Sequence, residues 1–174
     1  NGGPITKNAS RNSPLRGAKG DVWEGGHRVP FALQWKGTLP AGKTYDHPVS
    51  SLDFAATMVA LSGAKVDKAK PLDGVNIIPY LTGKNPNPPH EVLYLRKFDQ
   101  QSYSARKRNY KLVIPFRNGK PQLYDLAEDI GETSNLASAK PKILAELNDL
   151  RKEWVAQLID PTFKGLIHLK KGSR

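Results

Sequence analysis

The stretch that decides the fold covers residues 14–30 and reads PLRGAKGDVWEGGHRVP. A glycine-rich segment in a compact domain is usually a functional loop, and further glycines lie upstream at Gly2 and Gly3. The next residues, 29–35, are the short apolar run VPFALQW, which fits a strand buried on both faces. We therefore expect a functional loop over 1–28 and a strand over 29–35, in a parallel or mixed sheet of an α/β domain.

Downstream of this strand the sequence predicts one helix and then a linker. Ser50 and Asp53 form a capping box before an apolar run, and Gly63 is a stop signal, so we expect a helix over 51–62. Residues 85–90, NPNPPH, are rich in proline and predict an extended linker. Residues 1–84 should therefore form the end of an α/β domain.

Residues 91–174 have a different pattern. Short β-prone runs lie at 92–97, 103–106, 110–115 and 122–126, separated by polar turns such as Asn118-Gly119. After Pro141, apolar residues recur at three- and four-residue spacing up to Leu158, which is typical of an amphipathic helix. We expect a C-terminal α+β subdomain: a four-stranded antiparallel sheet with this helix packed on one face.

Composition excludes several classes of protein. The 174 residues, 38% of them hydrophobic, suffice for one domain or two small subdomains. The absence of cysteine excludes disulfides, cysteine-ligated metals and cysteine nucleophiles within these residues. No apolar run is long enough for a membrane span, and the first residues do not resemble a signal peptide. Because the sequence opens without Met inside a glycine-rich loop, we expect a segment of a longer protein.

The net charge of +11 suits an anionic partner. The charge is nevertheless spread evenly, because residues 1–87 hold 11 Lys+Arg against 6 Asp+Glu and residues 88–174 hold 16 against 10. Arg106, Lys107 and Arg108 lie between Tyr103 and Tyr110, a pattern that can grip a nucleic-acid strand. The same charges suit a strand edge or hairpin, which we favour. A non-catalytic basic module that binds polyanions stays an alternative.

Several motifs along the chain resemble one enzyme family. In chain order they are NGG at 1–3, PLRGAKG at 14–20, WEGGHRVP at 23–30, SSLD at 50–53, LDGV at 72–75, LTG at 81–83, YKLV at 110–113, and LYDL at 123–126 followed by Glu132 and NLA at 135–137. This order resembles the C-terminal part of the type I, formylglycine-dependent sulfatases, which are arylsulfatase-like and have an alkaline-phosphatase-like fold. The chain departs from the family pattern at Ala18, often Gly, and at Ile130, often Pro.

The resemblance implies roles for two residues. Lys19 matches the family's lysine that contacts the substrate sulfate, where an ammonium can stabilise negative charge on the sulfuryl oxygens. Asn1 matches an asparagine that binds calcium, and an amide oxygen is a donor that calcium accepts. The formylglycine nucleophile and most calcium ligands of the family lie upstream of this region. The chain would thus carry only a partial calcium site, and we expect these residues alone to be inactive.

The rest of the loop is expected to be structural. Glu24 and Arg28 flank Gly25-Gly26, so the two side chains can pair and brace the loop. His27 could bind substrate or donate a proton to the leaving alcohol, but we favour a structural role for it. The remaining histidines, His47, His90 and His168, are isolated in the sequence and are expected at the surface.

The resemblance implies a sulfuric ester hydrolase acting on a carbohydrate or aryl sulfate. Its partners would be a sulfated small molecule or glycan and the N-terminal part of the same enzyme, without a membrane and without nucleic acid. Such enzymes are usually exported, so the resemblance implies the periplasm or the cell exterior. A phosphate or phosphonate ester hydrolase of the same superfamily is the alternative enzyme, although the loop around Lys19 favours sulfate.

Overall fold

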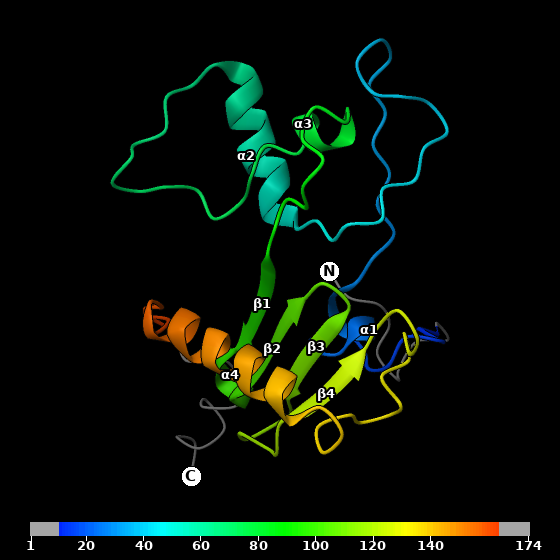
Figure 1. Cartoon of the computed structure of the whole chain (residues 1–174). Helices are drawn as coiled ribbons and strands as arrows, with labels where there is room; N and C mark the ends of the chain where they lie inside the picture. The colour runs from blue at the N-terminus through cyan, green and yellow to red at the C-terminus, as the bar shows by residue number, and fades with distance from the viewer. Residues whose placement is uncertain (1–10, 164–174) are drawn as a thin grey trace. The chain divides into compact units, whose positions relative to one another are not determined.

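The computed structural model describes residues 11–163, which fall into two compact units (Figure 1). The first, here called the sheet unit, contains residues 11–30 and 92–163. The second, here called the helical unit, contains residues 31–91.

The sheet unit is built on a four-stranded antiparallel sheet with strand order β1-β2-β3-β4. The strands are β1 (Val92–Lys97), β2 (Ser102–Lys107), β3 (Tyr110–Ile114) and β4 (Gln122–Asp125), and a 3-10 turn, η1 (Phe98–Gln100), joins the first two. In the register, Ala105 lies opposite Leu112, which lies opposite Leu123. The four predicted strands are confirmed, and no end differs from the predicted one by more than one residue.

One face of this sheet is covered by α4 (Pro141–Ala156), as Figure 1 shows. Ala105, Leu112, Ile114 and Leu123 of the sheet and Leu147 of α4 form a buried core. Pro141 occupies the first turn, where a backbone N–H has no intrahelical acceptor, so proline costs the helix no hydrogen bond there. The predicted packing of this helix on the sheet is confirmed, and the helix ends two residues before the expected Leu158.

The other face of the sheet carries the N-terminal loop. Because side chains alternate along a strand, Leu112 and Ile114 belong to the core under α4, whereas Val113 packs with Val22 of the loop and Leu126. The loop contains α1 (Glu24–His27), a single turn of helix. The sheet therefore has a separate hydrophobic cluster on each side.

The helical unit contains α2 (Ser51–Ser62) and the short α3 (Ile78–Leu81). The expected capping box starts α2: the Ser50 N–H donates to Asp53 Oδ2 at 2.7 Å. Gly63 ends the helix at φ 70°, a left-handed conformation that glycine adopts without strain. The helix predicted over 51–62 is confirmed.

The strand expected at 29–35 does not form in this structure. Those residues are in no strand, and the described helical unit contains none. Phe31 is 58% exposed and Trp35 41%. A strand needs a neighbour to satisfy its ladder hydrogen bonds, and residues 31–91 supply no such neighbour.

The structure also divides the chain differently from the expected domains. The described part of the loop, residues 11–28, packs in the sheet unit rather than with residues 29–84, because Val22 and α1 are bound by β3, β4 and the turn after β4. The linker at 85–90 does lie next to the boundary at Val92. Among residues 11–163, no helix is both long and apolar enough to span a bilayer.

Candidate functional site

Lys19 lies at the tip of a tight turn in the N-terminal loop. Gly17 and Gly20 lie on either side of it with φ of +84° and +92°, backbone angles that residues with a side chain rarely adopt. Across the turn, the Asp21 N–H donates to the Ala18 carbonyl at 2.9 Å, and the Ala18 N–H donates to Asp21 Oδ2 at 2.8 Å. Lys19 is exposed, and within residues 11–163 no ion pair holds its ammonium. The turn therefore leaves the Lys19 side chain exposed to solvent.

The base under this turn is α1. The Gly25 N–H donates to the Arg16 carbonyl at 2.7 Å. A Cβ added at Gly25 would lie 2.5 Å from the Gly17 carbonyl oxygen, and one at Gly26 would overlap the Asp21 carbonyl. The Gly25-Gly26 pair is thus required because the backbone of α1 packs directly against the backbone of residues 16–21.

Two side chains hold the loop in place, Asn12 within the loop and Arg16 to the segment after β4. Asn12 Nδ2 donates to the Gly17 carbonyl at 2.8 Å and to the Gly25 carbonyl at 3.1 Å. The Arg16 guanidinium lies 3.7 Å from the centre of the Trp23 ring and donates to the Glu132 carbonyl at 2.8 Å. These contacts link the Lys19 turn to α1 and to the segment after β4.

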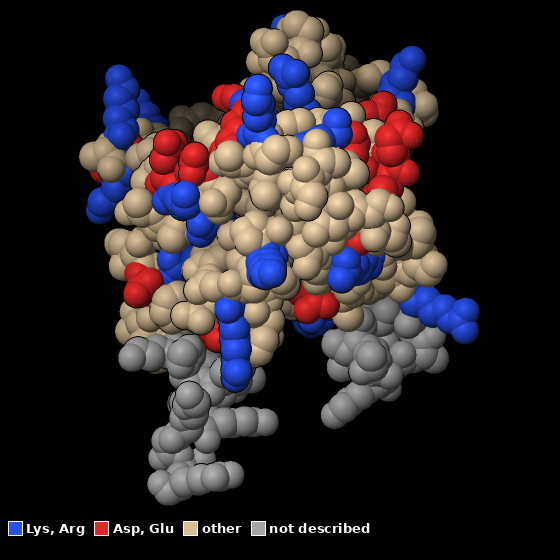
Figure 2. All heavy atoms as spheres, turned by 60° about the horizontal axis from the view of Figure 1, so that its bottom comes forward, with Lys and Arg blue, Asp and Glu red and all other residues tan. Residues whose placement is uncertain are grey.

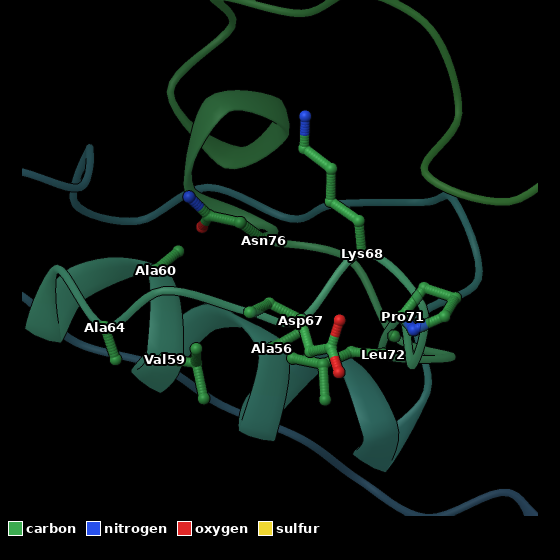
Figure 3. A pocket seen from close by; sticks show the side chains of 11 residues that line it. Ala56, Val59, Ala60, Ala64, Asp67, Lys68, Pro71, Leu72 and Asn76 are labelled. Atoms are coloured by element: carbon green, nitrogen blue, oxygen red, sulfur yellow. The ribbon is translucent and has the colours of Figure 1, made fainter.

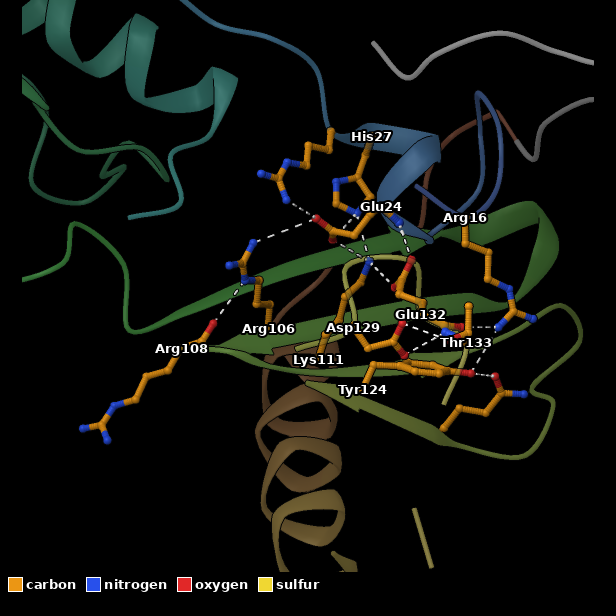
Figure 4. A network of polar contacts seen from close by, with 12 residues as sticks. Arg16, Glu24, His27, Arg106, Arg108, Lys111, Tyr124, Asp129, Glu132 and Thr133 are labelled. Atoms are coloured by element: carbon orange, nitrogen blue, oxygen red, sulfur yellow. Dashed lines mark hydrogen bonds and ion pairs between the residues drawn. The ribbon is translucent and has the colours of Figure 1, made fainter. Parts of the chain in front are cut away.

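At α1 lies a polar group, the Lys111 cluster, which comprises Glu24 and His27 of α1 together with Lys111 and Glu132 (Figure 4). The His27 side chain is 32% exposed, and the other three residues are buried. Lys111 Nζ lies 2.8 Å from Glu24 Oε1, 2.9 Å from Glu132 Oε1 and 3.2 Å from His27 Nε2. An ammonium has three N–H donors, and two of them have hydrogen-bond acceptors, Glu24 Oε1 and His27 Nε2. The contact to Glu132 Oε1 is a close ion pair rather than a well-aligned hydrogen bond.

The second oxygen of Glu132 holds the helix itself. Glu132 Oε2 accepts from the Glu24 backbone N–H at 2.7 Å. Lys111 is 1% exposed, Glu24 1% and Glu132 0%, so these contacts are shielded from water. Arg28 and Arg106 lie at the edge of the cluster, 3.5 Å and 3.9 Å from Glu24 Oε2.

The two carboxyl groups are shifted in opposite directions. Burial alone raises the pKa of Glu24, but the Lys111 ammonium and the other nearby cations outweigh it, so the pKa is lowered. Burial also raises the pKa of Glu132, and there the attraction to Lys111 does not cancel it. Glu24 is therefore the firmly ionised partner of Lys111.

His27 stays neutral in this environment. Burial and then the charge of Lys111 lower the pKa of His27 to about 4. The Nε2 atom of a neutral imidazole can accept a hydrogen bond from the Lys111 ammonium, which agrees with the 3.2 Å contact. This geometry fits the structural role that we favoured and opposes a role as a cationic proton donor near neutral pH.

The predicted pairing of Glu24 with Arg28 is present at 3.5 Å, but Lys111 lies closer to the Glu24 carboxylate, at 2.8 Å. Sequence reasoning missed Lys111. The available signal was a lysine inside an apolar strand motif, YKLV, with Glu132 among the same landmarks. The predicted calcium ligand Asn1 lies outside the described residues. For Lys19 the contact with sulfate stays a prediction.

The expectation that His90 lies free at the surface is wrong. Its side chain is 13% exposed, and Nε2 lies 2.8 Å and 2.9 Å from the two oxygens of Asp53, which is fully buried. Asp53 Oδ1 also accepts the Val75 N–H at 2.9 Å. The Asp53–His90 pair therefore ties the end of the linker to the start of α2. His168 lies outside the described residues.

The basic run at Arg106, Lys107 and Arg108 belongs to a hairpin, as expected, but not to a sheet edge, because β2 is an inner strand. Lys107 pairs with Glu146 of α4 at 2.9 Å, and Arg106 approaches Glu24. On the face drawn in Figure 2, basic side chains are scattered among acidic ones. The structure thus offers no continuous basic groove on that face.

Two further features fall short of a site. Within residues 11–163, no three His, Asp or Glu side chains lie together so as to hold a metal ion. An open groove lies beside α2 in the helical unit (Figure 3). It is lined mainly by small apolar side chains such as Ala56, Val59 and Ala60, with Asp67 and Lys68 as its charged residues. Such a lining lacks convergent polar groups, so the Lys19 turn is the best candidate site.

Known proteins are similar to this chain in sequence. Residues 18–159 match the family described as "N-sulphoglucosamine sulphohydrolase, C-terminal". The chain is 27% identical to the uncharacterized sulfatase YdeN of Escherichia coli K12, over 89% of this chain and 34% of that protein. It is 30% identical to human arylsulfatase A, over 86% of this chain and 35% of that protein.

Solved structures share the fold. The crystal structure of Ps i-CgsB matches with a TM-score of 0.83 at 28% identity, over 98% of this chain and 38% of that chain. The structure of Ps i-CgsB in complex with k-i-k-neocarrahexaose matches with a TM-score of 0.77 at 29% identity, over 87% of this chain and 34% of that chain. This chain spans about a third of the length of the curated relatives it matches.

Proposed function

Because the chain belongs to the sulfatase family and corresponds to the C-terminal region of its members, we propose that it forms part of an enzyme that hydrolyses sulfate esters. The observation that carries the proposal is the Lys19 turn, an exposed ammonium on a rigid glycine-rich loop that packs against α1. When a nucleophile attacks sulfur, negative charge builds up on the nonbridging and leaving oxygens. A fixed ammonium beside those oxygens stabilises the transition state.

We further propose that the nucleophile, a formylglycine, and most calcium ligands come from outside this chain, with Asn1 contributing one amide oxygen to the metal. Calcium bound there would supply positive charge beside the reacting group. The described residues hold no group of metal ligands. Besides Asn1, what this chain would contribute is Lys19 and the loop that holds it.

The proposed substrate is a sulfated carbohydrate, with a simple aryl sulfate as a second possibility of the same chemistry. A structural relative at 29% identity was solved in complex with k-i-k-neocarrahexaose, and the net charge of +11 favours an anionic substrate. An enzyme acting on such polymers would meet them outside the cytoplasm, and we propose the periplasm or the cell exterior.

The proposed protein partner is the remaining part of the same sulfatase. The chain spans about a third of its relatives. The helical unit also leaves large apolar side chains in contact with water, among them Phe31, Leu52 and Phe54, at 58%, 53% and 49% exposure. Apolar surface of this kind is typical of a face that another part of a protein covers. We expect no turnover of sulfate esters by residues 1–174 alone.

The test is Lys19→Ala in the sulfatase that carries this chain, assayed with an aryl sulfate and an aryl phosphate. Loss of one electrostatic contact at a developing charge should cost about 2 to 4 kcal/mol of transition-state stabilisation, mainly in kcat. Lys19→Arg should rescue poorly, since a planar guanidinium places its charge differently. Lys36→Ala, an exposed lysine of the helical unit, is the control.

A kcat/KM for Lys19→Ala within about threefold of the parent, with the fold intact, would show that Lys19 does not contact the sulfuryl group. Faster hydrolysis of the phosphate than of the sulfate by the parent would favour the alternative enzyme class.

A further inference from the structure

The Lys111 cluster joins three segments that are far apart in the sequence. Glu24 belongs to α1, Lys111 to β3, and Glu132 to the turn after β4. All three side chains are almost fully buried. They are therefore too deep to contact a substrate, and the proposed reaction does not use them.

Stability alone is a poor reason for burying these charges. Taking ions out of water carries a large desolvation penalty, and well-packed apolar residues can often replace a buried ion pair without loss of stability. What the charges determine is the relative arrangement of the segments that carry them. The Lys111 ammonium is satisfied only when Glu24, Glu132 and His27 occupy one arrangement around it.

The helix that this arrangement holds, α1, would not be stable by itself. With four residues and no side-chain cap at its N-terminus, α1 is far shorter than a helix that is stable alone. Glu24 is bound twice, through its side chain to Lys111 and through its backbone N–H to Glu132. The place of α1 is therefore set by the cluster.

The place of α1 in turn sets the Lys19 turn. Gly25 and Gly26 bring the backbone of α1 against the carbonyls of Arg16, Gly17 and Asp21. At Gly25 and Gly26 the two backbones meet directly, and the Asn12 side chain donates to a carbonyl of each segment. A shift of α1 would therefore move the turn that carries the Lys19 ammonium.

We propose that Lys111 is a positioning residue for the sulfatase reaction: by holding Glu24 and Glu132 it fixes α1, and α1 fixes the turn that places Lys19 at the sulfuryl group. This inference rests on the function proposed for Lys19. Lys111 acts through Lys19 and contacts no substrate. Its removal should therefore lower activity only as far as Lys19 is misplaced.

The first test needs no activity. In this chain, Lys111→Met keeps an unbranched side chain one atom shorter and removes the ammonium. Amide hydrogen exchange in residues 16–27 should rise by about tenfold or more, while exchange in β1 and in α2 stays as in the parent. Lys152→Met, which removes an exposed lysine paired with Asp149 on α4, is the matched control and should leave residues 16–27 unchanged.

Lys111→Met leaves two buried carboxyl groups without their cation, so a milder variant accompanies it. Glu132→Gln keeps an oxygen that can accept the Glu24 N–H and removes one charge. It should loosen residues 16–27 to a smaller degree. Unchanged exchange in residues 16–27 in a folded Lys111→Met or Glu132→Gln variant would overturn the proposal, as would loosening that extends equally over the whole sheet unit.

The second test is a double-mutant cycle in the sulfatase that carries this chain. A misplacement of about 1 Å can cost about 100-fold in rate, so Lys111→Met should lower kcat by that order. If Lys111 acts only through Lys19, the variant carrying both Lys19→Ala and Lys111→Met should be no slower than Lys19→Ala alone.

The outcomes separate the two proposals. Losses that multiply in the double variant mean that Lys111 acts independently of Lys19, and the positioning role is then wrong. A silent Lys111→Met beside a slow Lys19→Ala refutes positioning and leaves the proposed function standing. A silent Lys19→Ala refutes the sulfate contact itself and with it the positioning role, whatever Lys111→Met does.

Discussion

The two units of this chain treat their apolar residues in opposite ways. In the sheet unit Leu112 and Leu123 are fully buried beneath α4. In the helical unit Leu52 of α2 is 53% exposed and Phe54 49%. The difference lies in the second layer: the sheet has a helix of its own chain to cover it, whereas residues 31–91 supply no comparable cover for α2. Apolar side chains form a core only where a second layer of secondary structure covers them.

Buried polar groups follow the same division. The sheet unit buries a charged cluster that links three segments. In the helical unit the Asp53–His90 pair and Thr57, whose hydroxyl accepts the Ile77 N–H at 3.0 Å, tie loops to α2. Polar contacts in the helical unit thus hold local geometry, and those of the sheet unit organise the candidate site.

The largest effect that would sharpen this comparison is expected from a matched pair of leucine substitutions. Leu112→Ala removes a fully buried side chain and should cost about 2 to 5 kcal/mol through lost burial and the cavity left behind. Leu61→Ala, at a position 44% exposed in α2, should stay within about 1 kcal/mol. Segment-resolved hydrogen exchange measures each unit separately. Equal losses in both units would break the comparison.

A smaller effect should appear as acid weakens the sheet unit. Folded His27 has its pKa lowered to about 4, against about 6.5 when unfolded. Between these values the unfolded chain binds a proton that the folded chain does not. The free energy of unfolding should therefore fall as pH falls from 6.5 to 4, by at most about 1.4 kcal/mol per pH unit from this residue.

Urea denaturation across this pH range measures the slope. In a Trp35→Phe background, fluorescence reports Trp23 and Trp154, which both lie in the sheet unit. His27→Gln, which keeps an acceptor for Lys111, should flatten the slope. His47→Gln in the helical unit is the control, and an equal flattening there would assign the effect to something other than the Lys111 cluster.

The smallest effect on stability is expected from Phe31→Ser. Phe31 is 58% exposed, so its loss should change the stability of this chain by about 0.5 kcal/mol or less. Self-association, measured by sedimentation velocity, should nevertheless decrease because an exposed apolar face is reduced. Phe116→Ser, 49% exposed in the sheet unit, is the control. A loss above about 2 kcal/mol for Phe31→Ser would show that this chain already covers that face.

Local patterns predicted the parts of the fold that local physics governs. The β-prone run at 110–114 and the helical spacing after Pro141 are visible in the sequence because strand propensity and the period of an amphipathic helix both act within a few residues. The Ser50–Asp53 capping box acts across three residues, so it could be located without a structure. The family resemblance directed attention to Lys19 in the same way, through a contiguous motif.

Pairings between distant segments were not visible in that way. Nothing local shows that Lys111 faces Glu24, 87 residues away, or that His90 faces Asp53, 37 residues away. The assignment of the N-terminal loop to the sheet unit and the absence of a strand at 29–35 have the same origin. Both depend on which other segment packs beside the residues in the folded chain. The spacing of apolar residues along a segment does not identify that other segment.

The sequence by itself determined the four strands, the two longer helices, the glycine-rich loop and the lysine at its tip, because propensity, periodicity and capping act within a few residues. Tertiary structure alone decided the partners: which carboxylates surround Lys111, which unit holds the loop, and which apolar faces stay uncovered. A buried charge is costly unless a group of opposite charge or a hydrogen-bond partner lies beside it, whereas a surface charge is solvated by water. Only the folded chain specifies which partner a buried charge has.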